Sequence, residues 1–183
     1  MSTRALAALS LGLAFGCRVQ PSAIGAPAAP VAVDSPAGVA LVAACTPSGP
    51  ELCFNAIDDN CNGVIDEGCG LTTGALQFTI AWGDSPADVN LRVQGPGAGA
   101  VGSPRIDRDC PREGCGGQNV ENAFVEGADV IRGKYTVSVE LGDTHGASLP
   151  VRVRFGGRVL SKSYGADLEL ERRGDVKTFV FTL

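Results

Sequence analysis

Alternation of apolar and polar residues dominates the sequence after residue 75 and constrains the fold more than any other feature. In the stretch "LQFTIAW", Phe78, Ile80 and Trp82 occupy every second position. The same period recurs in "DVNLRVQ", "KYTVSVEL", "PVRVRF" and "KTFVFTL". Side chains of a β-strand point alternately to opposite faces, so this period indicates strands with one buried face. Because no segment after residue 16 repeats apolar residues at helical spacing, we predict an all-β fold.

Clusters of turn-forming residues between these stretches predict an antiparallel β-sandwich. Gly, Pro and Asp gather in "GDSPAD", "GPGAGAVGSP" and "GDTHGAS". With such punctuation, roughly seven or eight short strands fit between residues 75 and 183. Aromatic residues make up only 5% of the chain, so we expect a mainly aliphatic core.

Residues 1–16 have the pattern of a signal peptide. Arg4 precedes the apolar run "ALAALSLGLAFG", which is too short to span a bilayer as a mature helix. The string "LAFGC" resembles the lipobox of bacterial lipoproteins, although Ala14 replaces the usual leucine. This resemblance implies a lipid anchor on Cys17 that attaches the protein to the outer membrane or cell surface. Ordinary cleavage is the alternative, and it would give a periplasmic or secreted protein.

The seven cysteines fit an exported chain. If Cys17 is lipidated, six remain for three disulfides, which are typical of oxidising compartments. Cys110 and Cys115 are close enough in sequence to close a small loop together. The other four are evenly spaced: Cys45, Cys53, Cys61 and Cys69. The sequence leaves all three pairings of these four cysteines open.

Residues 17–44 lead from the signal peptide to the first of these four cysteines. The stretch from Arg18 to Ala44 is rich in Ala, Pro, Val and Gly, and Asp34 is its only acidic residue. Such a stretch cannot bury enough apolar surface to offset the entropy lost on ordering, so we predict a flexible tether. The alternative is that part of "GVALVAA" forms an edge strand.

Residues 45–70 form an acidic, cysteine-rich stretch. From residue 51 to residue 69 there are five acidic residues and no basic one, whereas residues 70–183 have 14 acidic residues against 13 basic ones. Oxygen-bearing side chains alternate around Gly63 in the order of an EF-hand loop as far as its ninth position. Glu67 replaces the final glutamate of such a loop, whose position Cys69 occupies. The predicted calcium ligands are Asp58, Asn60, Asn62, the carbonyl group of Val64, Asp66 and Glu67.

This stretch, "ELCFNAIDDNCNGVIDEGC", resembles the short metal-binding motif of MopE-like bacterial surface proteins. The motif has a form close to "E-x-C-N-G-x-D-D-N-C-D-G-x-x-D-E-G-C". The chain departs from it at Asn62, where aspartate is common, and in "FNA". The resemblance implies a bound metal, and the ligands suit calcium better than copper because His145 is the only histidine. The alternative is an acidic turn that disulfides close without an ion.

Residues 75–183 resemble the YfaP-type domain, a bacterial extracellular family of unknown function. The matching stretches occur in the family's order: "LQFTIAWGDSPADVNLRV", "IDRDCPREGCGGQNVENAFVEG", "GKYTVSVEL" and "VKTFVFTL". The resemblance implies a β-sandwich that binds a partner or has a structural role. Asn90 stands where the family pattern has an acidic residue.

A second candidate ion site lies in the same region. Asp84, Asp88 and Asn90 fall at one end of the first predicted hairpin. Four further polar residues could approach them across the fold: Asp107, Asp109, Asn119 and Glu121. Such a set of oxygens suits calcium. Carboxylates and amides that only cap turns are the alternative.

Catalysis and nucleic-acid binding are both disfavoured. A nucleophilic hydrolase needs a base beside Ser or Cys, and His145 lies in a loop of turn residues. Lys and Arg are interleaved with acids and form no basic face for phosphate. We predict a non-enzymatic cell-envelope lipoprotein whose β-sandwich binds a protein or glycan partner, or packs in the envelope. The alternatives are a calcium-dependent carbohydrate-binding or adhesion module, and an accessory or inhibitor domain of a secreted enzyme.

Overall fold

The computed structural model of the protein describes residues 30–43, 45–83, 85–97, 103–110, 115–127 and 130–183. The predicted signal peptide, Cys17 and Asp84 lie outside these ranges. The described residues include no helix that is long and apolar enough to cross a membrane.

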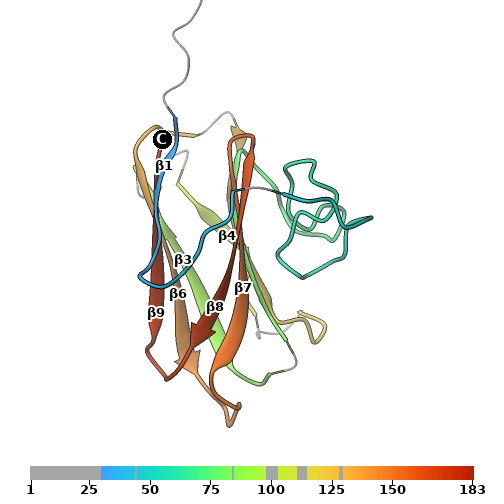
Figure 1. Ribbon diagram of the computed structural model, residues 1–183, viewed down its shortest axis with the longest axis vertical. Coiled ribbons are helices and arrows are strands. Elements are labelled where there is room, and N and C mark those ends of the chain that lie inside the picture. The colour runs from blue at the N-terminus through green and yellow to red at the C-terminus, as the bar shows by residue number, and fades with distance from the viewer. Residues whose placement is uncertain (1–29, 44, 84, 98–102, 111–114, 128–129) are drawn as a thin grey trace, which may run out of the picture.

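Two antiparallel sheets form a sandwich, which confirms the predicted fold class (Figure 1). A four-stranded sheet has the order β1-β9-β6-β3, and a five-stranded sheet has the order β4-β5-β2-β7-β8. The strands are β1 (Ala32–Asp34), β2 (Leu76–Trp82), β3 (Asp88–Gln94), β4 (Arg105–Arg108), β5 (Val120–Val125), β6 (Lys134–Asp143), β7 (Val151–Val159), β8 (Lys162–Leu170) and β9 (Val176–Thr182). Strands β2 to β9 match the predicted number for residues 75–183.

The core between the sheets is more aromatic than the composition suggested. Phe155 of β7 stacks on Phe179 of β9 with ring centroids 4.4 Å apart, and Phe78 of β2 lies 5.2 Å from Phe181. All four rings are buried. The few aromatic residues of the chain are thus concentrated where the two sheets meet, and aliphatic side chains of the same strands surround them.

The predicted tether requires a correction. Residues 32–34 form β1, which pairs with β9 at the edge of the four-stranded sheet. Val42 then bridges Gly165 of β8 through two backbone hydrogen bonds of 2.9 Å. Both edges offer free backbone groups, so a chain of low sequence complexity is ordered here by pairing with the sheets. The prediction of a flexible tether over residues 17–44 is therefore wrong for the described part, residues 30–43.

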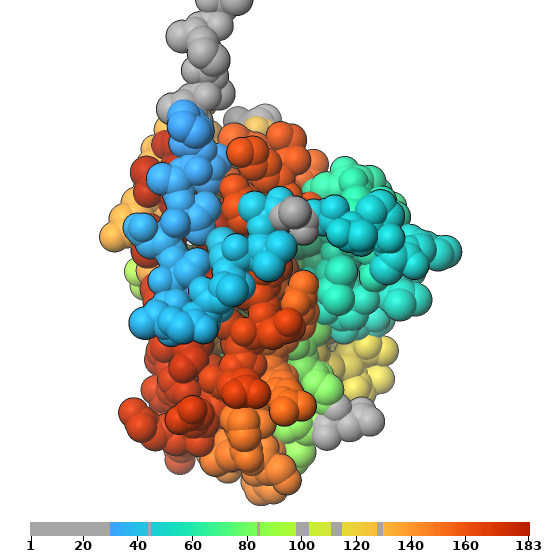
Figure 2. Space-filling model, viewed as in Figure 1, coloured from blue at the N-terminus to red at the C-terminus, as the bar shows by residue number. Residues whose placement is uncertain are grey.

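The cysteine-rich residues 45–70, here called the acidic module, pack on the outer face of the five-stranded sheet (Figures 1 and 2). Gln77 of β2 donates a hydrogen bond to the carbonyl of Ile65 at 3.0 Å. A side chain at Gly156 of β7 would collide with the backbone carbonyl of Ala56. Every residue of β2 is consequently buried, although its alternating sequence predicted one exposed face. The module supplies the second layer of cover.

Candidate metal and binding sites

The disulfides of the acidic module interleave along the chain. Cys45 pairs with Cys61, and Cys53 pairs with Cys69. This resolves the pairing that the even spacing left open. The two closed loops overlap between residues 53 and 61. Elsewhere, Cys110 pairs with Cys115, as predicted.

The loop around Gly63 is built from side chains that accept hydrogen bonds from nearby backbone N–H groups. Asp58 Oδ1 accepts from Asn62 N at 3.0 Å, and Asp58 Oδ2 accepts from Gly63 N at 2.9 Å. Asn60 and Asn62 each accept from the N–H two residues further along. These are local turns of the kind that Asp and Asn favour. Ser163, at the start of β8, donates a further 2.6 Å hydrogen bond to Asp58 Oδ2 and fixes the loop to the sandwich.

Asp66 lies at the buried centre of the module. Its two carboxylate oxygens accept from the N–H groups of Asn55 and Ala56, each at 3.1 Å. Burial raises the pKa of Asp66, while these hydrogen bonds act to lower it. The backbone N–H of Asp66 donates to Glu51 Oε1 at 2.8 Å. The Asp66 carboxylate thus ties the segment around residue 66 to the backbone of residues 55 and 56.

Glu51 is the residue of this site that the EF-hand order missed. Its Oε2 atom is buried and makes no hydrogen bond of normal geometry. Burial raises the pKa of the carboxyl group, and the backbone N–H groups of Asp66 and Asn60 oppose this rise. The carboxylates of Asp59 and Asp58 raise the pKa as well. The MopE-like motif does begin with a glutamate at this place, and that was the available signal.

The predicted calcium ligands divide into two groups. Asp58, Asn60 and Asn62 share one loop, and Glu67 joins it because Asn60 Nδ2 donates to Glu67 Oε1 at 2.8 Å. Asp66 instead points to residues 55 and 56. Val64 is half-buried, and its N–H is bound by Asn62. Within the described residues, no three Asp, Glu, His or Cys side chains converge closely enough to hold a metal ion. The orphaned oxygen of Glu51 is the observation that fits an added cation.

The residues of the second candidate ion site do not lie together as predicted. Asp88 and Asn90 of β3 lie over Gly142 of β6, where an added Cβ atom would be 2.9 Å from Asp88 Oδ2. Asp107 instead accepts hydrogen bonds from Thr72 and from Asn122, on the side of the sheet that carries the module.

The other residues predicted to approach that site also separate. Asn119 binds the carbonyls of Gly83 and Ser85. Glu121 points between the two sheets, where burial is the main cause that raises its pKa to about 8, and the carboxylates of Asp109 and Asp88 act in the same direction. The register explains the difference: residues 120 and 122 face the module, whereas residue 121 faces the core.

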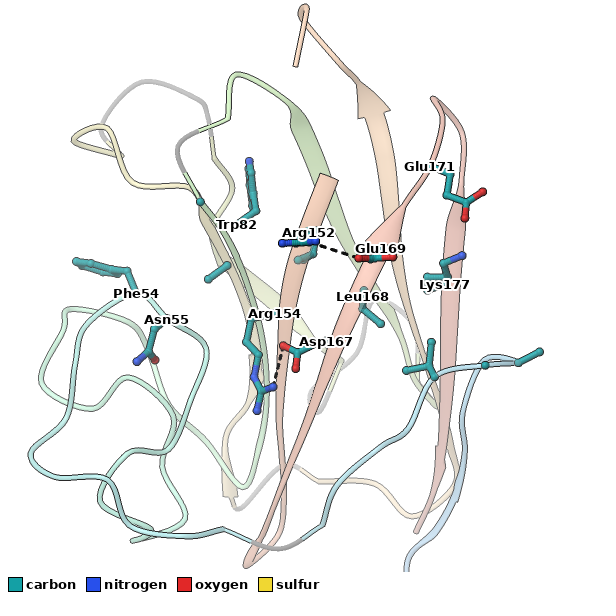
Figure 3. Close-up of a pocket in the computed structure, with 16 residues that line it drawn as sticks. Phe54, Asn55, Trp82, Arg152, Arg154, Asp167, Leu168, Glu169, Glu171 and Lys177 are labelled. Atoms are coloured by element: carbon teal, nitrogen blue, oxygen red, sulfur yellow. Dashed lines mark hydrogen bonds and ion pairs between the residues drawn. The ribbon is translucent and has the colours of Figure 1, made fainter. Parts of the chain in front are cut away.

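A groove of 750 Å³ runs along the outer face of β7 and β8 beside the module (Figure 3). Arg154 pairs with Asp167 at 2.9 Å and Arg152 with Glu169 at 3.4 Å across its floor. Phe54 and Asn55 of the module form one wall, and residues 37–39 line the other side. The sequence did not predict this groove, because it forms only when the module docks.

His145 lies in the turn after β6 and is 57% exposed, with Nδ1 3.7 Å from Asp143 Oδ1. His145 donates its backbone N–H to this carboxylate, and this bond is the largest cause of the lowered pKa of Asp143. The histidine is thus part of a surface turn.

Comparisons with protein-family models, with curated proteins and with solved structures found no match to this chain. The MopE-like and YfaP-type resemblances therefore stay predictions.

Proposed function

We propose that the protein is a non-enzymatic, exported binding protein of the cell envelope whose acidic module takes up calcium. The observation that carries this proposal is Glu51 Oε2, a buried carboxylate oxygen that makes no hydrogen bond of normal geometry. It lies in a module with five acidic residues and no basic one. Buried acceptors are nearly always satisfied, so an orphaned carboxylate oxygen among other acids favours a cation.

Calcium would supply positive charge to this module and compensate the repulsion among its carboxylates. Glu51 would hold the ion together with oxygens of the predicted set, which are Asp58, Asn60, Asn62, Val64, Asp66 and Glu67. The chain's own contribution is to enclose two groups of these residues in one small module: the loop that Asp58, Asn60, Asn62 and Glu67 share, and Asp66, which points to residues 55 and 56. The two disulfides close the module, and Asp66 and Ser163 fix its two halves.

The module also forms a wall of the groove, and this links calcium to partner binding. Asn55 donates its backbone N–H to Asp66, and both Phe54 and Asn55 border the groove. A change in how the carboxylates of the module are neutralised would therefore reach this wall directly. We infer that an envelope partner binds the groove and that calcium strengthens this binding.

Calorimetric titration of calcium into the oxidised protein tests the proposal. Glu51→Gln preserves the size of the side chain and its acceptor for Asp66 N–H, yet removes the charge. We expect saturable binding in the wild type and a loss of roughly tenfold or more in affinity in this variant, since even residues behind the ligands commonly change affinity by that much. Glu126→Gln, at an exposed ion pair with Arg105, is the matched control and should bind as the wild type does. Equal affinities in the wild type and Glu51→Gln would exclude the module as the site.

A second candidate is calcium-dependent recognition of a glycan in the same groove. The paired Arg and carboxylate side chains of β7 and β8 present polar groups beside Phe54 (Figure 3). A glycan array probed with and without a calcium chelator separates the candidates. Calcium-dependent binding that Arg152→Ala abolishes would favour a glycan. Binding to an envelope protein, without binding to any glycan on the array, would favour a protein partner.

Attachment to a membrane through Cys17 is the remaining part of the proposal. It rests on the lipobox-like string "LAFGC". Mass spectrometry of the N-terminal peptide of the exported protein tests it directly. A diacylglyceryl group on Cys17 is expected, and an unmodified N-terminus after cleavage elsewhere would refute the anchor.

A further inference from the structure

The side of β8 that faces away from β7, here called the β8 edge, borders the groove with backbone hydrogen-bonding groups. Strand β8 is the last strand of the five-stranded sheet, so β7 covers only one of its sides. All nine of its residues pair with β7 without a shift in register. At Gly165 the β8 edge already accepts a chain, because Val42 exchanges two backbone hydrogen bonds of 2.9 Å with it. This edge is therefore able to bind an extended segment.

The β8 edge continues past this bridge with backbone groups that are not paired. In an antiparallel ladder, the N–H and C=O groups of every second residue point to the same side. Asp167 and Glu169 therefore direct their backbone groups away from β7, as Gly165 does. Within the described ranges, no hydrogen bond joins these groups to another residue. Because both residues also line the groove, a strand that enters the groove would find four backbone groups open to it.

The other edges of the two sheets are less suited to an added strand. In β3, the N–H of Leu91 already donates to Glu121 at 2.6 Å. Strand β4 has four residues, and its register with β5 shifts between Ile106 and Arg108. Strand β1 has only three residues. Short or irregular edges hinder the addition of a strand, so the long and regular β8 edge is the one that favours it.

Carboxylates on the outer face of β8 favour a particular kind of strand. The side chain of Asp167 is 85% exposed and that of Glu169 is 57% exposed. Each binds an arginine of β7 through one oxygen, Asp167 Oδ1 to Arg154 and Glu169 Oε1 to Arg152 (Figure 3). An added strand would lie on the opposite side of β8 from these arginines. A lysine or arginine on it would complete a row of alternating charges across three strands, and such cross-strand pairs stabilise a sheet.

A second copy of the chain fits the β8 edge poorly. Val42 occupies the position at Gly165, so two β8 edges could pair in antiparallel fashion only through Asp167 and Glu169. This pairing would set Asp167 of one copy opposite Glu169 of the other. Like charges directly opposite one another destabilise a sheet, and charged residues commonly protect edge strands from self-association. The acids therefore disfavour a second copy and favour a basic segment.

We propose that the β8 edge binds an extended segment of a partner protein as an added antiparallel strand, with lysine or arginine at the alternate positions beside Asp167 and Glu169. Main-chain hydrogen bonds to these two residues would supply affinity, and the alternate side chains would supply selectivity. This inference rests on the proposed function, since it specifies how the envelope partner occupies the groove. It does not require calcium.

Amide hydrogen exchange of the oxidised protein, resolved by residue with NMR, tests the added strand. The probe is the synthetic peptide Thr-Lys-Val-Lys-Val-Lys-Thr, and its matched control has glutamate in place of each lysine. At saturating basic peptide, exchange at the amides of Asp167 and Glu169 should slow by roughly tenfold or more, because each gains a hydrogen bond. The amides of Leu168 and Leu170, which point to β7, should not change. The acidic peptide at the same concentration should slow neither edge amide.

Variants of the edge separate its backbone from its charge. Glu169→Pro removes an outward N–H, which a sheet tolerates at an edge, and should weaken binding of the basic peptide by roughly tenfold or more. Glu169→Gln keeps this N–H and should weaken binding less. If the proline variant does not fold, the Asp167→Asn/Glu169→Gln protein still tests the charge, because it should bind the basic and acidic peptides equally. Glu126→Gln, at an exposed ion pair after β5, is the control and should bind as the wild type does.

Three outcomes would overturn the proposal. The first is unchanged exchange at Asp167 and Glu169 with the basic peptide, and the second is equal slowing with the acidic one. The third is slowing without any peptide that increases with protein concentration, since a second copy would then occupy the edge. Repeating the exchange with calcium and with a chelator distinguishes this proposal from the calcium site. Peptide binding that ignores calcium would support the added strand and contradict only its link to calcium, whereas calcium binding without peptide binding would overturn the strand alone.

Discussion

The acidic module and the sandwich are stabilised by different interactions. In the module, Ala56 and Ile65 are the buried apolar residues, and order comes from two disulfides and from carboxylates that bind backbone N–H groups. In the sandwich, side chains from strands far apart in the sequence fill a continuous core. The module depends on links between residues that are close in sequence, and the core depends on long-range packing.

This difference suggests that the module can open while the sandwich stays folded. Residues 45–70 could not bury enough apolar surface to fold alone, whereas the disulfides limit how far the unfolded module can spread. Docking on β2 and β7 then positions the module. Changes in the core should therefore affect the whole protein, and changes in the module should remain local.

The largest loss of stability is expected when the aromatic core is truncated. Phe155→Ala removes a ring that stacks on Phe179 and packs near Phe78 and Phe181. We expect the free energy of unfolding to fall by about 3–5 kcal/mol, because a cavity is left between the sheets. Urea denaturation followed by tryptophan fluorescence measures it. Val176→Ala, 45% exposed on β9, should change stability by less than about 0.5 kcal/mol. Similar losses in both variants would mean that the core is loosely packed.

Removal of a module disulfide should have the next largest effect and should stay local. The Cys45→Ser/Cys61→Ser pair opens a loop of 16 residues in sequence separation. Closure of a loop of about 15 residues contributes roughly 3 kcal/mol. We expect rapid proteolysis within residues 45–70, while the denaturation midpoint of the sandwich changes little. The Cys110→Ser/Cys115→Ser pair has a sequence separation of only 5 and is the control for a smaller loop. Simultaneous unfolding of the whole chain would contradict the separation of the two regions.

The module and the sandwich also differ in the hydrogen bonding of a buried carboxylate, Asp66 in the module and Glu121 in the sandwich. The second of these makes the free energy of unfolding depend on pH. Both oxygens of Asp66 accept hydrogen bonds from backbone N–H groups, whereas one oxygen of Glu121 meets no such donor and the carboxyl group lies close to that of Asp109. The pKa of Glu121 is about 8 in the folded protein against 4.5 for the free group, with burial as the main cause. Between these values the folded protein holds a proton that the unfolded chain releases. Stability without calcium should therefore fall as pH rises through this window, by up to roughly 1.4 kcal/mol per pH unit, and level off above it.

Glu121→Gln isolates this contribution. Chemical denaturation between pH 6 and pH 8, with calcium chelated, should show a loss of roughly 2 kcal/mol in the wild type that the variant lacks. Other titrating groups contribute equally to both proteins, so the difference between the two profiles is the relevant quantity. Parallel profiles would show that Glu121 is already ionised at pH 6 and is neutralised in another way.

The sequence predicted those parts of the fold that follow from local periodicity. Alternation in residues 134–141 and 151–155 predicted β6 and β7, because the outer faces of these strands stay partly solvated. The same rule failed for β2, whose outer face the module covers. Strand β1 was not predicted either, because it has only three residues and no alternating pattern of its own. Pairing with the edge strand β9 orders it.

The candidate sites were predictable in composition but not in arrangement. The order Asp58, Asn60, Asn62, Gly63 identified a loop, and that loop exists. Glu51 was not predicted as a ligand, because it comes close to Asp66 only when the interleaved disulfides fold the module back on itself. Glu121 and Asp107 were grouped by residue type, although the register of β5 and the path of β4 direct them to opposite faces of one sheet. Which face a side chain occupies was the information that local patterns did not contain.

The smallest effect is expected where one hydrogen bond joins the two regions. Ser163 on β8 donates to Asp58 Oδ2, 105 positions away in the sequence. Ser163→Ala should weaken docking by about 1–2 kcal/mol, since a hydrogen bond to the buried carboxylate of Asp58 is lost. Hydrogen exchange resolved by peptide should then accelerate in residues 53–69 and stay unchanged in β6 and β9. Ser161→Ala, in the exposed turn before β8, should leave both regions unaffected. Acceleration in the core strands as well would mean that the module and the sandwich open together, and that docking is part of one cooperative unit.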